Sequence, residues 1–84
     1  MSYWVYILRG IRSGKLYVGQ TDNVSRRLQE HEEGRGGQYT RQNGPWELRY
    51  AEEWPSRTEA VRRERYLKSV AGSREKRRLA EYGA

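Results

Sequence analysis

The sequence predicts an α+β fold in which a small three-stranded antiparallel sheet is flanked by helices, with the elements in the order ββαβαα. Three stretches carry strand signals: residues 3–9 are rich in β-branched and aromatic residues, residues 15–20 alternate, and residues 46–54 are interpreted as a third strand. Only a short turn containing "RSG" separates the first two, which predicts a hairpin. The third strand should end at Pro55, because proline cannot donate to a strand ladder.

Capping residues mark the start of each predicted helix. The candidates are Thr21, Asp22 and Asn23 for the first helix, Ser56 with Glu59 three residues later for the second, and Ser73 for a last, basic helix. Gly34 and Gly72 are expected to end the first two helices, because glycine is the usual residue just past a helix end.

The length of 84 residues predicts one small domain over residues 1–84, with a thin core. Because the chain has no Phe but seven Tyr and three Trp, several polar aromatic groups should lie in or near that core. It has no Cys, which excludes disulfides and thiolate zinc sites. The N-terminal stretch "MSYWVYILRG" is too short and lacks the basic start of a signal peptide. We therefore expect a cytoplasmic protein without a membrane partner.

The charge of the chain favours a nucleic-acid partner. Seventeen basic residues against eleven acidic ones give a net charge of +6, and Arg accounts for fourteen of the seventeen. The planar guanidinium group suits bidentate contact with phosphate. The alternative is that a small domain carries net charge for solubility alone.

Two predicted helices each place a charged or titratable group on the face expected to be buried. Glu64 shares a narrow sector with Ala60, Leu67 and Ala71 at the helical step of about 100°. In the first helix, His31 lies on the apolar stripe and Arg27 lies at its edge. A buried charge without a partner is costly. Either Arg27 and Glu64 form a structural ion pair, or these groups line a cleft.

The predicted hairpin places two tyrosines side by side. Tyr6 shares a strand face with Trp4 and Leu8, and Tyr17 shares one with Lys15 and Gly19. A glycine inside a strand often marks a close approach of a ligand or another backbone. Alternatively, Tyr is simply a good strand former and Gly19 eases the end of the strand.

The motifs "VYI" at 5–7, "YVG" at 17–19, "DNVSRRLQEH" and "AVRRERYLK" occur in that order, and "GGQYTR" and "EEWPSRTEA" accompany them. Together they resemble the GIY-YIG nuclease superfamily, above all its small stand-alone bacterial members, from about residue 3 to 67. The resemblance implies a GIY-YIG-like fold and a metal-dependent DNA endonuclease, as used in DNA repair or recombination. It departs from the family at Gln20, where some relatives carry a lysine, and no Asn follows Glu64.

The resemblance also implies roles for individual residues. Glu64 would hold a single Mg²⁺ or Mn²⁺ ion, and Arg27 would contact the phosphate. Tyr17 is the first choice for the general base, with Tyr6 or His31 orienting it or relaying the proton.

We expect further basic side chains to contact DNA, with RNA as an alternative substrate: Lys15, Arg26, Arg41, Arg63 and Lys68. A protein partner and the oligomeric state stay open. Two other functions are kept as alternatives. One is a nucleic-acid-binding module that does not cut, and the other is a structural or partner-binding domain.

Overall fold

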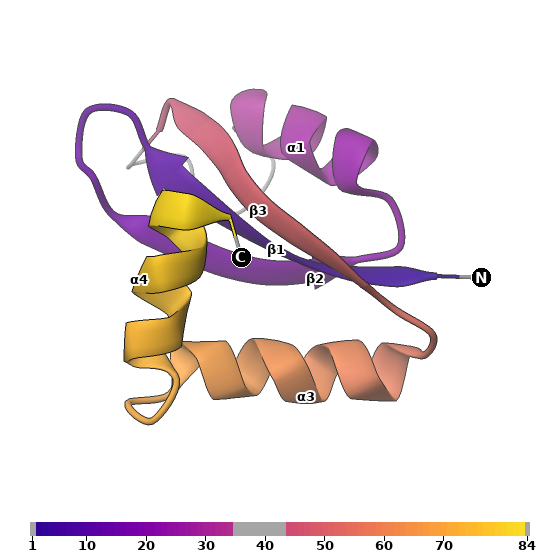
Figure 1. Cartoon of the computed structure of the whole chain (residues 1–84). Helices are drawn as coiled ribbons and strands as arrows, with labels where there is room; N and C mark the ends of the chain where they lie inside the picture. Colours follow the sequence, from indigo (N-terminus) through magenta and orange to yellow (C-terminus); the bar gives the residue numbers. More distant parts are fainter. Residues whose placement is uncertain (1, 35–43, 84) are drawn as a thin grey trace.

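The computed structural model describes residues 2–34 and 44–83. The elements within these ranges are the strands β1 (Tyr3–Gly10), β2 (Leu16–Thr21) and β3 (Trp46–Trp54), and the helices α1 (Val24–Glu32), α3 (Arg57–Lys68) and α4 (Ser73–Tyr82). Their order is ββαβαα, as predicted, and the α+β fold is confirmed (Figure 1). In this part of the chain, no helix has the length and apolar character needed to cross a membrane.

The three strands form one antiparallel sheet in the order β2-β1-β3, so that β1 lies in the centre. Tyr6 pairs with Gly19 on one side and with Ala51 on the other. Leu8 pairs with Tyr17. Because directly paired residues project from the same face, this register brings Tyr6 and Tyr17 to one face, in agreement with the alternation of the sequence.

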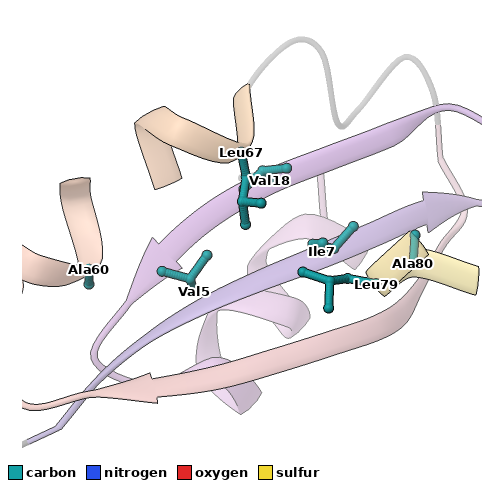
Figure 2. Close-up of a cluster of buried hydrophobic side chains, with 7 residues drawn as sticks. All are labelled: Val5, Ile7, Val18, Ala60, Leu67, Leu79 and Ala80. Carbon is teal, nitrogen blue, oxygen red and sulfur yellow. The ribbon is translucent and has the colours of Figure 1, made fainter. Parts of the chain in front are cut away.

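The helices cover opposite faces of the sheet: α1 lies on one, and α3 and α4 lie on the other (Figure 1). The α3/α4 face carries the larger core, which consists of Val5, Ile7, Val18, Ala60, Leu67, Leu79 and Ala80 (Figure 2). The α1 face carries a second cluster around Tyr6, Leu8 and Trp46. Each side of the sheet thus has its own small core.

Side chains fix the start of two helices as expected. The Asn23 carboxamide oxygen accepts the backbone N–H of Arg26 at 3.0 Å and caps α1. Ser56 Oγ accepts the backbone N–H of Glu59 at 3.2 Å and caps α3. The expected cap at Ser73 is wrong, because Ser73 is the first residue of α4 and its hydroxyl donates to the Val70 carbonyl.

The second predicted helix ends earlier than its apolar spacing indicates. α3 stops at Lys68, and Ser69 Oγ donates to the Tyr66 carbonyl at 2.6 Å, which takes a hydrogen bond that a continuing helix would use. Ala71 is therefore exposed in a turn, and its predicted place beside Glu64 is wrong. Gly72 is needed in this turn because a Cβ there would lie 2.1 Å from the Tyr66 carbonyl oxygen.

Helix α4 is held against the sheet by two arginines. Strand β3 carries a bulge in which Arg49 has no partner on β1. The Arg49 guanidinium donates to the carbonyls of Ala80 at 2.7 Å and Glu81 at 3.2 Å, near the C-terminal end of α4. At the other end of α4, Glu75 pairs with Arg63 of α3. The position of α4 is therefore fixed at both ends.

Candidate active site

The hairpin places two tyrosine rings together on the α1 face. The ring centroids of Tyr6 and Tyr17 are 6.2 Å apart. Gly19 leaves the space for this arrangement, because a Cβ there would lie 2.5 Å from the Tyr6 hydroxyl oxygen and 3.0 Å from the Tyr17 ring. The groups that approach Gly19 closely are thus two side chains of the same hairpin, whereas the sequence suggested a ligand or another backbone.

Helix α1 brings His31 to these rings. His31 Nε2 lies 2.9 Å from the Tyr6 hydroxyl oxygen in a buried hydrogen bond. The His31 ring meets the Tyr17 ring edge-on, with the centroids 5.1 Å apart. Tyr6 and His31 are each only 2% exposed. Among residues 2–34 and 44–83, nothing bonds to the buried Nδ1 of His31. His31 is therefore a buried partner of the tyrosines, held on one of its two nitrogens.

Arg27 is the cation of this cluster. Its guanidinium, about 30% exposed, donates to the Glu30 carboxylate at 3.0 Å. Burial acts to lower the pKa of Arg27, but hydrogen bonds to Glu30 and to the Tyr6 and Tyr17 hydroxyls outweigh it and raise the pKa. Arg27 thus links Glu30 with both tyrosines, and part of its side chain faces solvent.

Burial keeps Tyr6 and His31 uncharged near neutral pH. It raises the pKa of Tyr6 far above its usual value of about 10, Tyr17 adds to the rise, and Arg27 opposes it. Burial also lowers the pKa of His31, and the charge of Arg27 acts in the same direction. Tyr6 therefore stays a phenol and His31 a neutral imidazole, which is consistent with their short hydrogen bond.

Glu64 reaches the same edge of the sheet from α3. It lies between the buried Ala60 and Leu67 along α3, as its spacing predicts, and its side chain is 18% exposed. Lys68, one turn later, donates to the Glu64 carboxylate at 3.2 Å. The Lys68 Nζ also lies 5.8 Å from the centroid of the Tyr17 ring. The Lys68–Glu64 pair therefore adjoins the tyrosine cluster.

Lys68 places a cation beside Tyr17, whereas position 20 is occupied by the uncharged Gln20. Gln20 lies three positions after Tyr17 along β2. Because successive side chains of a strand point to opposite faces, these two side chains project from opposite faces of the strand. The sequence does contain a signal for Lys68, since an acid followed by a lysine four residues later is a standard helical pair. That Lys68 lies against Tyr17 depends on the packing of α3 beside β2, which the spacing alone does not reveal.

The donor set suits one hydrated hard cation. The described residues contain no cluster of three or more His, Cys, Asp or Glu side chains able to hold a metal. Mg²⁺, however, keeps several waters and commonly uses one or two carboxylates together with substrate phosphate. Glu64 offers such a carboxylate, and the Lys68 ammonium already occupies a cation position beside it. A single ion held by Glu64 therefore fits, whereas a cage made entirely of protein ligands does not.

The other basic residues expected to contact DNA have different surroundings. Lys15 is exposed at the hairpin turn, and Arg26 is exposed and paired with Asp22 at 2.6 Å. Arg63 is only 20% exposed and pairs with Glu52 at 2.8 Å and with Glu75. Its guanidinium is thus engaged within the protein, and we assign it to the anchoring of α3 and α4. Arg41 lies outside the described residues.

Comparison with known proteins shows which family the chain resembles. The model of the GIY-YIG catalytic domain matches residues 2–78. The chain is 38% identical to a UPF0213 protein of Bacillus licheniformis over 95% of this chain and 81% of that protein. It is 41% identical to a UPF0213 protein of Oceanobacillus iheyensis over 95% of this chain and 91% of that protein.

A solved structure agrees with this assignment. The solution NMR structure of a UPF0213 protein from Bacillus halodurans covers all of this chain and 88% of its own, with a TM-score of 0.59 and 34% sequence identity. The names of these relatives state no activity. The family match nevertheless spans almost the whole chain, from β1 into α4. The chain therefore belongs to the GIY-YIG catalytic domain family.

Proposed function

We propose that this chain is a divalent-metal-dependent endonuclease that hydrolyses DNA phosphodiester bonds. Membership in the GIY-YIG family indicates a nuclease-type function on nucleic acid. The observation that carries the proposal is the position of Tyr17. Its half-buried ring contacts the buried Tyr6–His31 pair and also lies beside the Lys68–Glu64 pair.

Tyr17 is the best candidate for the general base. A residue that takes a proton from an attacking water must reach that water. Tyr6 and His31 are too deeply buried to do so, whereas Tyr17 is partly exposed. In this mechanism Tyr6 and His31 are positioning residues that hold the Tyr17 ring. The Tyr17 oxygen acts in its phenolate form: it orients the water and receives its proton, which restores the hydroxyl.

Arg27 is the candidate phosphate ligand. Phosphodiester hydrolysis gathers negative charge on the non-bridging oxygens, and preorganised donors lower the barrier. The guanidinium is paired with Glu30 at 3.0 Å, and hydrogen bonds to both tyrosine hydroxyls contribute to its raised pKa, so it lies among these groups before substrate binds. A guanidinium suits a bidentate contact with a phosphate oxygen pair, and the Arg27 side chain is about 30% exposed.

Glu64 is the residue that would hold the metal ion. When bound, a divalent cation supplies positive charge to the phosphate oxygens and to the leaving oxygen. For this, the Lys68 ammonium has to leave the Glu64 carboxylate. Lys68 can then turn toward the substrate phosphates, because half of its side chain is exposed.

One observation favours the alternative of a nucleic-acid-binding module that does not cut. The Lys68–Glu64 pair satisfies the carboxylate without any metal. The structural alternative has less support, because the structure pairs Arg27 with Glu30 and Glu64 with Lys68, each on its own helix. The type of DNA, tolerance of RNA and a role in repair or recombination stay predictions.

The test compares wild type, Glu64→Gln and Glu53→Gln on supercoiled, linear, single-stranded and branched DNA, with Mg²⁺, Mn²⁺ or EDTA. Glu64→Gln removes one charge and keeps the side-chain shape. Glu53→Gln is the matched control, since Glu53 is an exposed acid on β3. We expect wild type and Glu53→Gln to nick DNA only with metal, and Glu64→Gln to be inactive.

Two results would contradict the proposal. Nicking that persists in EDTA, or that survives in Glu64→Gln, removes the metal-dependent mechanism. If every substrate stays intact while folded wild type still shifts DNA in a gel, the protein is a binding module.

A further inference from the structure

A hollow of about 420 Å³ lies between the β1–β2 turn and α4. Its lining contains none of the five candidate catalytic residues. The walls come from three separate parts of the chain, with Arg9 on β1, Lys15 at the turn, and Lys76 and Arg77 on α4. It is therefore a site built by the tertiary fold, which distinguishes it from a groove along a single helix.

The lining is strongly basic. Its four basic side chains face one acidic residue, Glu81. Arg9 is paired with Glu47 at 3.4 Å. All eleven acidic residues of the sequence lie within 2–34 and 44–83, and within those ranges no carboxylate forms an ion pair with the other three bases: Lys15, Lys76 and Arg77. Three basic groups that form no ion pair converge on a hollow whose lining contains a single carboxylate, Glu81. The excess of positive charge is the pattern of an anion site.

The α4 wall of the hollow is rigid. Leu79 and Ala80 are buried in the main core, so this side of α4 cannot turn away. Arg49 holds the C-terminal carbonyls of the helix, and the pair between Arg63 and Glu75 holds its first turn. The backbone that carries Lys76 and Arg77 is thus held in place, so a ligand has to order only their side chains.

The hollow also lies close to the candidate active site along the chain. Lys15 is two residues before Tyr17, and an extended chain rises about 3.3 Å per residue. The two backbone positions are therefore separated by roughly 7 Å. A polyanion that has one charged group beside Tyr17 can reach Lys15 with a neighbouring one.

We propose that the hollow between the β1–β2 turn and α4 binds a backbone phosphate of the nucleic acid, next to the phosphate at the candidate active site. Lys15 and Arg77 approach the phosphate from opposite walls, and Lys76 completes the site. This rests on the proposed function only in that the partner is nucleic acid. It assigns to α4 a role in substrate affinity, separate from the chemistry at Tyr17 and Glu64.

The test is a salt titration of DNA binding in EDTA, so that no cleavage occurs. Anisotropy of a labelled 20-base-pair duplex gives the dissociation constant at each KCl concentration. In the double variant Lys76→Ala/Arg77→Ala, we expect binding to weaken by about tenfold at low salt. The slope of log K against log[salt] should fall in magnitude by roughly 1 to 2, since each lost phosphate contact removes about 0.9 from it.

Arg62→Ala/Arg65→Ala is the matched control. Both residues are exposed on α3, and the variant loses the same two positive charges. It should keep a slope close to that of wild type. Lys15→Ala tests the opposite wall without touching a helix, and its slope should fall in magnitude by about 1. A thermal melt of each variant shows that the protein measured is folded.

The outcomes separate this inference from the proposed function. If wild type cuts nothing but binds DNA, and the Lys76→Ala/Arg77→Ala slope falls while the control slope does not, the phosphate site stands. If the salt slope falls by the same amount in both double variants, only net charge matters and the site is overturned. The site is also overturned if Lys15→Ala and Lys76→Ala/Arg77→Ala both bind DNA like wild type. Neither of the last two results affects the nuclease proposal.

Discussion

The two faces of the sheet are packed in different ways. On the α3/α4 face every fully buried core residue is aliphatic, as Val5, Ile7 and Leu67 illustrate. On the α1 face the buried groups include Tyr6 and His31, which need each other as hydrogen-bond partners. The aliphatic face supplies stability that depends on contact area alone. It thereby allows the other face to hold polar groups in positions suited to chemistry.

Replacing Tyr17 by Phe should show the different roles of the two faces most clearly, because it should affect activity and leave stability almost unchanged. The ring stays and its contacts with Tyr6 and His31 are kept, but the hydroxyl is lost. Because general-base catalysis contributes about 10²- to 10⁴-fold, nicking should fall by that factor while the melting temperature changes little. Tyr82→Phe is the control, since Tyr82 is 78% exposed on α4. An unchanged nicking rate in Tyr17→Phe would remove Tyr17 as the base.

Replacing Leu67 by Ala should have the opposite effect. Leu67 is fully buried in the aliphatic core, and removing such a side chain costs about 2–5 kcal/mol. Urea unfolding followed by tryptophan fluorescence measures this loss. Val70→Ala should cost less than about 0.5 kcal/mol, because Val70 is 93% exposed. Equal midpoints for the two variants would contradict the assignment of stability to the α3/α4 face.

Gly19→Ala should reduce both the folding stability and the nicking activity, because it pushes a methyl group into the Tyr6 ring. Tyr6 is buried and cannot swing aside, so we expect a loss of about 1–3 kcal/mol together with reduced nicking. In a double-mutant cycle with Tyr6→Phe, the combined loss should be smaller than the sum, since removing the hydroxyl relieves part of the clash. A wild-type unfolding midpoint for Gly19→Ala would show that the hairpin adapts.

A smaller effect should follow from pH. The lowered pKa of His31 means that below about pH 6.5 the unfolded chain takes up a proton that the folded protein does not. Stability should therefore fall as the pH drops from 7 to 5.5, by at most about 1.4 kcal/mol per pH unit. Thermal melts over this range measure the slope, and His31→Gln should flatten it.

Acidic groups change the folding stability in a lower pH range than His31 does. Burial acts to raise the pKa of Glu52, but hydrogen bonds from Arg63, Tyr50 and Trp54 outweigh it and lower the pKa. The stability that Glu52 contributes is lost only below about pH 4.5. A slope between pH 7 and 5.5 that is the same in His31→Gln and wild type would show that His31 is not its source.

The fold could be predicted because its signals are local. The alternation in residues 3–9 and 15–20 fixes which side chains share a face, and Asn23 and Ser56 cap helices within three residues of themselves. The end of α3 was predicted wrongly for a local reason as well. The competing hydrogen bond of Ser69 outweighs the apolar spacing that extends to Ala71.

The candidate site could be predicted only in part, because contacts between distant elements decide the rest. Spacing along α1 places His31 inward, but its hydrogen bond to Tyr6 depends on how α1 crosses the sheet. Arg63 looked available for DNA, yet Glu52 and Glu75 lie 11 and 12 residues away along the chain and meet it only after folding. Lys68 of α3 likewise lies beside Tyr17 of β2 only because these two elements pack together in the folded protein.

The bulge at Arg49 has a consequence for changes in chain length. One additional residue in β3 both interrupts the ladder with β1 and turns a guanidinium toward the end of α4. Deleting that residue would restore an uninterrupted ladder and at the same time remove the side chain that holds the C-terminal carbonyls of α4. An insertion or deletion at this point of β3 therefore changes both the sheet and the attachment of the last helix.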